Sequence, residues 1–268
     1  MLTAHKNTDR FKGFARLYND ARPACPKYVV DILTRYLGRH PNTVVDMGCG
    51  TGLSTLVWRN AAHRIIGVEP NDDMRAVAVI NADGIKNIEF INAFSDNTGL
   101  ESGIADILTC SQSFHWMEPE STLCEINRLL KPGGIFAAYD CDWPPVCASR
   151  DVESAYIKLI ERERRIESDA PGYKSNFIHY PKNRHLENIQ KSNYFGYTRE
   201  IVFSNTEICD ADRYNRIALS QGGIQAILKK EPELIEKELN AYKTAVDKYF
   251  GSETLPIEFC YRMRLGAK

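Results

Sequence analysis

Three glycines, each separated by one residue, follow an apolar run and a carboxylate in the stretch TVVDMGCGTGL (Thr43–Leu53). Gly48 and Gly50 match the start of the dinucleotide fingerprint G-x-G-x-x-G/A, but Leu53 occupies the position of its last small residue. Gly52 is followed by Leu and Ser rather than by the Lys-Ser/Thr pair of a phosphate-binding loop. The loop therefore lets a ligand approach the backbone closely without the usual residues for a pyrophosphate. This favours a nucleoside that carries no phosphates.

Two acidic residues stand at the ends of the predicted strands beside this loop. Asp46 ends the apolar run before the glycines, and Glu69 ends the next one, RIIGVE. The carboxyl ends of parallel strands meet at one edge of an open α/β sheet, where ligands bind. A carboxylate at the Glu69 position can accept two hydrogen bonds from a ribose diol, and one at Asp46 can meet an amino group. A tight turn that needs small residues would explain the glycines but not these two acids.

Alternating strand and helix patterns position these residues. The expected strands are 43–47, 64–69, 87–93, 105–111 and 134–140, with helices over 52–60, from 71 onward and over 118–130. This order predicts βαβ units and a parallel, doubly wound, Rossmann-like sheet. At the end of the chain, residues 257–268 alternate apolar and polar side chains, which predicts one more strand with a buried face.

The motifs DMGCGTG and GVEP resemble those of the class I S-adenosylmethionine-dependent methyltransferases, nearest the small-molecule type-11 group. The resemblance covers residues 10–142 and implies a seven-stranded sheet whose last strand is antiparallel. It also implies that the glycines pass under the methionine and ribose, that Asp46 lies near the methionine amino group and that Glu69 holds the ribose hydroxyls. The implied cofactor-binding residues are Asp46, Gly48, Cys49, Gly50, Gly52, Glu69, Pro70, Asn92, Ala93, Phe94, Ser111 and Gln112. S-adenosylhomocysteine is the implied product.

One position departs from the family pattern. Members usually carry an acid before alanine after the third strand, where it contacts the adenine amino group, whereas this chain has Asn92-Ala93. An asparagine can still accept a hydrogen bond through its amide oxygen. Asn92 is therefore expected to keep the adenine contact.

Several residues are expected on the side of the methyl acceptor. In similar proteins the stretch SQSFHWMEP after the fourth strand passes close to the sulfonium, which makes His115 the candidate general base because its unperturbed pKa is about 6.5. A purely packing role for His115 and Trp116 is the alternative. The resemblance also implies that the segment with Tyr18 and Arg22 folds over the cofactor, and Arg22 is expected to pair with a carboxylate. The expected catalytic residues are His115 and Tyr18, and the expected acceptor pocket contains Arg22, Trp116, Tyr139, Asp142 and Trp143.

Composition narrows the function classes. The net charge of -1 in 268 residues gives no global basic field for a nucleic-acid backbone, and no stretch is apolar enough for a membrane span. The amino terminus has no apolar segment typical of a signal peptide, which favours a cytoplasmic protein. The eight cysteines lack CxxC pairs and favour free thiols over a zinc site. His179 and His185 are expected at the surface, and no metal site is predicted.

These observations predict an enzyme of class 2.1.1 that methylates a small molecule, as a monomer or homodimer. The alternative is a protein that binds S-adenosylmethionine or S-adenosylhomocysteine without turnover, as a sensor or scaffold. Three segments are expected: a cofactor-binding core with amino-terminal lid helices over 1–148, a helical cap inserted after the fifth strand over 149–197, and carboxy-terminal strands and helices that complete the sheet over 198–268.

Overall fold

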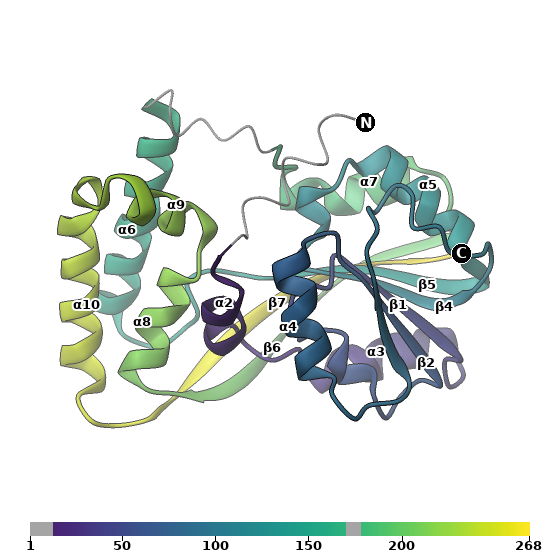
Figure 1. The fold of residues 1–268 in the computed structure, drawn as a ribbon, viewed down its shortest axis with the longest axis horizontal. Helices are drawn as coiled ribbons and strands as arrows, with labels where there is room; N and C mark the ends of the chain where they lie inside the picture. The colour runs from purple at the N-terminus through teal and green to yellow at the C-terminus, as the bar shows by residue number, and fades with distance from the viewer. Residues whose placement is uncertain (1–12, 170–177) are drawn as a thin grey trace.

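The computed structural model describes residues 13–169 and 178–268 (Figure 1). The expected core (1–148) and the expected cap (149–197) each include residues outside these described ranges, namely 1–12 and 170–177. A mixed sheet occupies one half of the molecule, and a group of helices lies beside it.

Seven strands form one sheet in the order β3-β2-β1-β4-β5-β7-β6. β1 to β5 pair in parallel, and β7 runs antiparallel to both of its neighbours. The strands are β1 (Thr43–Met47), β2 (Arg64–Val68), β3 (Ile88–Ile91), β4 (Ala105–Ser111), β5 (Leu130–Cys141), β6 (Tyr197–Cys209) and β7 (Leu255–Ala267). The predicted fold class, a Rossmann-like doubly wound sheet whose last strand is antiparallel, is confirmed.

Helices cover both faces of this sheet because successive strand residues point to opposite sides. Val44 belongs to the apolar cluster that includes α3 (Lys27–Leu37), whereas Val45 belongs to the cluster with α5 (Pro119–Leu129) and α7 (His185–Lys191). α4 (Asp72–Asn81) begins at Asn71, whose side chain accepts a hydrogen bond from the backbone N–H of Met74 as an N-cap. The alternation of β1 thus builds two separate cores, one on each face.

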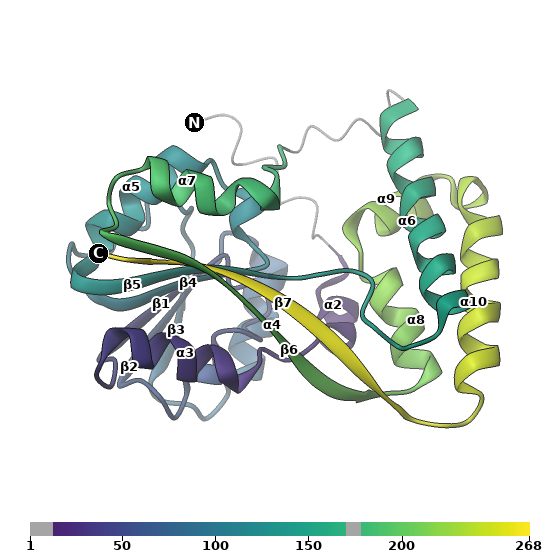
Figure 2. The same ribbon diagram turned by 180° about the vertical axis from the view of Figure 1, so that it is seen from behind.

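The remaining helices form a layer beside the β6–β7 end of the sheet (Figures 1 and 2). They are α6 (Arg150–Asp169), α8 (Ala211–Leu219), α9 (Gly222–Lys230) and α10 (Glu236–Phe250), with α2 (Ala15–Ala21) between α8 and α4. α6 packs along α10, so this layer combines part of the expected cap with the segment that follows it. Within the described ranges, none of the helices has the length and apolar character needed to cross a membrane.

The expected helix over 52–60 is wrong. Only a short 3₁₀ turn, Leu56–Trp58, forms there. Gly52 has a left-handed φ of +82°, and the hydroxyls of Ser54 and Thr55 bond to the Asp46 carboxylate. These two bonds and the left-handed Gly52 fix the start of the segment in a turn rather than in a regular helix.

Candidate functional site

A cavity of about 340 Å³ lies at the carboxyl ends of the central strands. Gly48 is essential to its shape, because a Cβ there would lie 2.6 Å from the Cβ of Ser113 and its φ is +68°. Nine of the residues expected to bind the cofactor line this cavity: Gly48, Cys49, Gly50, Glu69, Pro70, Ala93, Phe94, Ser111 and Gln112. The glycine turn and the tip of β2 are therefore parts of one site.

Glu69 is a buried carboxylate at the rim of the glycine turn. Its Oε2 accepts a hydrogen bond from the N–H of Gly50 at 2.9 Å, and its Oε1 accepts one from the N–H of Asn71 at 2.8 Å. Burial raises the pKa of Glu69 above its usual value, and the two backbone N–H groups oppose that rise. Each carboxylate oxygen can accept a second hydrogen bond, so two acceptor positions remain for a ligand.

Asp46 lies near the end of β1, directly before the glycine turn. Its side chain is fully buried and does not line the cavity. It accepts hydrogen bonds from the hydroxyls of Ser54 at 2.6 Å, Thr55 at 2.8 Å and Thr109 at 2.8 Å. Burial raises its pKa, against the effect of these three donors. Asp46 thus holds the loop after the glycines against β4, and its expected contact with the methionine amino group stays a prediction.

The segment after β3 lies at one end of the cavity. Ala93 and Phe94 line it, whereas Asn92 is exposed and is not among the lining residues, so its contact with adenine stays a prediction. Two polar residues that sequence reasoning missed, Ser95 and Asp96, line the same end. Gly52, another expected residue, lies behind the loop, where a Cβ would meet Phe90 and Ala78 at 3.2–3.3 Å.

A second cavity of about 610 Å³ lies between the sheet edge and the helical layer. Residues of α6, the start of α9 and the segment 179–182 line it. Five residues line both cavities: Tyr18, Arg22, Gln112, Trp116 and Trp143. All five are candidates from the sequence, and they define a junction between the two cavities.

Arg22 links α2 to the helical layer. Its guanidinium lies over the rings of Tyr18 and Trp143, 4.8 and 4.7 Å from their centroids, and it donates hydrogen bonds to Ser220 and Gln221. Within residues 13–169 and 178–268 its hydrogen-bond partners are Ser220 and Gln221, and the expected pairing with a carboxylate stays a prediction. At the junction, the rings of Tyr18 and Trp143 therefore supply apolar surface, and the guanidinium of Arg22 over these rings supplies a positive charge.

Two residues expected in the acceptor pocket do not line either cavity. Tyr139 is buried, and its hydroxyl lies 3.2 Å from the Sγ of Cys25. Asp142 is exposed and pairs with Arg262 at 3.7 Å. Tyr139 faces the apolar cluster that includes α3, and Asp142 follows the last residue of β5.

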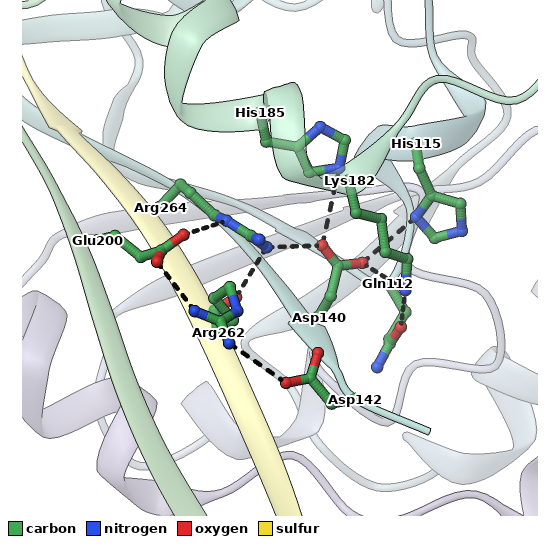
Figure 3. A network of polar contacts seen from close by, with 9 residues as sticks. All are labelled: Gln112, His115, Asp140, Asp142, Lys182, His185, Glu200, Arg262 and Arg264. Atoms are coloured by element: carbon green, nitrogen blue, oxygen red, sulfur yellow. Dashed lines mark hydrogen bonds and ion pairs between the residues drawn. The ribbon is translucent and has the colours of Figure 1, made fainter. Parts of the chain in front are cut away.

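Asp140, at the end of β5, is the centre of a buried polar network (Figure 3). Its Oδ1 lies 3.3 Å from the Nδ1 of His115 and 3.0 Å from the Nζ of Lys182. Its Oδ2 lies 3.3 Å from the Nη1 of Arg264 and 3.7 Å from the Nε2 of His185. Burial raises the pKa of Asp140, but the contact with His115 and the charge of Lys182 outweigh that effect and leave it well below its usual range.

Both histidines of this network are uncharged at neutral pH. Burial lowers the pKa of His115 to about 3 and that of His185 to about 4. The expectation that His185 lies at the surface is wrong, because its side chain is fully buried where α7 packs on the sheet. His115 is buried too, but it lines the second cavity.

The histidines and Asp140 are close enough to be considered as metal ligands. Their ligand atoms lie within 4.8 Å of one another. However, the cations of Lys182 and Arg264 already lie 3.0 and 3.3 Å from the two oxygens of Asp140. Two positive charges beside the only carboxylate of the group oppose a third cation, so the arrangement favours an internal ion-pair network.

The fold and site together define a class of protein. A seven-stranded sheet with antiparallel β7, a glycine turn after β1 and an acid after β2 is the arrangement of the class I methyltransferases. Residues 45–138 match the family model described as "Methyltransferase domain". Over residues 45–138 the chain is therefore similar to the class I methyltransferases, whose methyl donor is S-adenosylmethionine.

Individual relatives agree with this assignment. A "Probable S-adenosylmethionine-dependent methyltransferase" of Saccharomyces cerevisiae is 28% identical over 45% of this chain and 43% of that protein. An "Uncharacterized methyltransferase-like" protein of Schizosaccharomyces pombe is 24% identical over 94% of this chain and 92% of that protein. A solved structure from Anaeromyxobacter dehalogenans, described as a "Putative Type II Methyltransferase", has a TM-score of 0.67 at 18% identity and covers 92% of this chain and 97% of its own. The match spans less than half of the Saccharomyces cerevisiae protein. The similarity to the bacterial structure supports the fold alone.

Proposed function

We propose that this protein transfers a methyl group from S-adenosylmethionine to a small molecule. The donor would occupy the first cavity and the acceptor the second. The observation that supports this proposal is the junction, because the five side chains that line both cavities would place a donor and an acceptor next to each other. Methyl transfer from a sulfonium is a direct displacement, so holding two ligands in line and excluding water are the main requirements.

The first cavity fits the donor in two respects. Glu69 keeps an acceptor position on each oxygen, which suits the two hydroxyls of a ribose. Gly48 leaves room that any side chain would fill. When bound, S-adenosylmethionine supplies an activated methyl group and leaves as S-adenosylhomocysteine. The residues of the chain bind it, orient it and exclude water.

His115 is the proposed base if the acceptor must lose a proton. Its Nδ1 faces Asp140, which leaves Nε2 as the nitrogen that can face the second cavity. Burial lowers the pKa of His115 to about 3, so the imidazole is neutral at neutral pH and can accept a hydrogen bond from a hydroxyl, although this pKa makes it a weak base. An acceptor that is already deprotonated needs no base, and His115 then only orients it. Tyr18, at the junction, would help to close the site.

A methyl-transfer screen tests the proposal. The protein is incubated with methyl-labelled S-adenosylmethionine and fractionated metabolite pools, and labelled product and S-adenosylhomocysteine are measured. A Gly48→Val variant is the matched control, because its side chain would clash with Ser113 in the donor cavity. Transfer that depends on Gly48 supports the proposal. Tight binding of S-adenosylhomocysteine without transfer to any pool would instead support the catalytically silent alternative.

A further inference from the structure

Lys182 extends from the 3₁₀ turn Lys182–Arg184 toward the junction of the two cavities (Figure 3). Its Nζ lies 3.0 Å from the Oδ1 of Asp140 and 3.1 Å from the Oε1 of Gln112. A lysine ammonium has three N–H donors and no acceptor. One donor bonds to Gln112, and the ammonium forms an ion pair with the Oδ1 of Asp140, an atom that has no hydrogen-bond partner among the described residues. Lys182 also lines the second cavity, so at least one donor remains for a ligand there.

The contact with Lys182 also determines how Gln112 is oriented. Because lysine can only donate, the amide of Gln112 must present its oxygen to it, and its NH₂ group points elsewhere. Within residues 13–169 and 178–268, no acceptor bonds to that NH₂ group, and Gln112 lines both cavities. The backbone of Gln112 is held at a φ of +52°, which is uncommon outside glycine. Strained residues of this kind concentrate at functional sites.

The surroundings keep these donors in place. Asp140 is buried and ionised, with Lys182 on one oxygen and Arg264 on the other. The backbone N–H of Gln112 donates to the carbonyl of Tyr139 at 2.9 Å. The ammonium of Lys182 and the NH₂ group of Gln112 are thus two hydrogen-bond donors held next to each other, and the buried carboxylate of Asp140 pairs with the first of them.

We infer that Lys182 and Gln112 form a subsite for an anionic oxygen group of the acceptor, such as a carboxylate or a phosphate. Asp140 positions the ammonium of Lys182 in this subsite. The inference rests on the proposed function and narrows its substrate class. An ammonium group at this point would face donors only and would lose its hydration without replacement. The acids Glu161, Glu163 and Glu167 also line the second cavity, but all three lie on α6, and Glu163 and Glu167 are beside Gly223 at the start of α9.

Simple ions test the subsite without knowledge of the acceptor. The ¹⁵N-labelled protein, saturated with S-adenosylhomocysteine, is titrated separately with acetate, inorganic phosphate and methylammonium at constant ionic strength. The side-chain NH₂ signals of Gln112, assigned by their loss in Gln112→Glu, report binding. Acetate or phosphate should shift these signals saturably. The anion that binds with the lower Kd indicates whether the subsite prefers a carboxylate or a phosphate. Methylammonium should have no effect.

Variants decide whether the response belongs to this subsite. Lys182→Met should weaken anion binding at least about tenfold, in line with the loss of a charged hydrogen bond. Lys191→Met on neighbouring α7, an exposed lysine paired with Glu187, is the control and should leave it unchanged. Saturable binding of methylammonium, no response to either anion, or an unchanged affinity in Lys182→Met would each overturn the inference. Failure to bind S-adenosylhomocysteine would count against the proposed function instead, and titration of the free protein would still decide the subsite.

Discussion

Replacement of Glu69 by glutamine is the most direct test of the donor cavity. The carboxylate accepts one hydrogen bond on each oxygen from Gly50 and Asn71, and each oxygen has one further position for a ribose hydroxyl. Glutamine has nearly the same shape but only one acceptor oxygen, so its NH₂ group must face one of the two backbone donors. Hydrogen bonds to charged groups contribute about 1.5–3 kcal/mol. The Kd for S-adenosylhomocysteine should therefore rise about 10- to 150-fold.

Isothermal titration calorimetry with S-adenosylhomocysteine measures this change. Asp142→Asn is the matched control, because Asp142 is an exposed acid outside both cavities and its replacement should leave the Kd unchanged. Thermal melting of the ligand-free variant shows whether the glycine turn has survived the substitution. A Glu69→Gln protein that melts like the wild type and binds with a Kd within threefold of it would refute a role for Glu69 in the site.

Three further predictions concern other parts of the site. Gly48→Ala should weaken S-adenosylhomocysteine binding by at least about tenfold through its clash with Ser113, whereas Gly133→Ala, with a similar positive φ and open space around it, should change only stability. His115→Gln should lower kcat for an acceptor that must lose a proton and leave the S-adenosylhomocysteine Kd unchanged, whereas an unchanged kcat would support the packing role. The free energy of unfolding, measured with urea, should fall between pH 7 and pH 5, because the unfolded chain takes up protons near pH 6.5 while the folded pKa values of His115 and His185 are about 3 and 4. Each histidine should contribute about 2 kcal/mol to this loss, and an unchanged pH dependence in His185→Gln would contradict the assignment.

The donor cavity could be predicted from short-range patterns. The spacing of Gly48 and Gly50 after an apolar run, and Glu69 at the end of the next run, place these residues at one sheet edge in any parallel βαβ fold. The role of Asp46 could not be predicted in the same way. Its three hydroxyl partners come from the turn after the glycines and from β4, and their side-chain directions depend on the folded turn.

The buried network around Asp140 shows a different limit. His185 lies in the polar sequence PKNRHLENIQ, where its neighbours predict a solvated helix. It is buried only because α7 packs on the sheet beside β5, and Asp140 precedes it by more than forty residues. Hydrophobic periodicity describes single helices and strands and cannot relate the end of β5 to a short helix more than forty residues later. The contacts of Asp140 with His185 and with Lys182 therefore follow from tertiary packing alone.

The two cavities therefore depend on different parts of the chain. The first is built mostly from residues within 45–138, the range that matches the methyltransferase family. The second takes most of its wall from α6, from 179–182 and from 221–223, all outside that range. Similarity over the matched range can therefore identify the methyl donor but carries little information about the acceptor. Under the proposed function, acceptor specificity depends on contacts such as that between Lys182 and Gln112, where a residue beyond the matched range fixes the orientation of one within it.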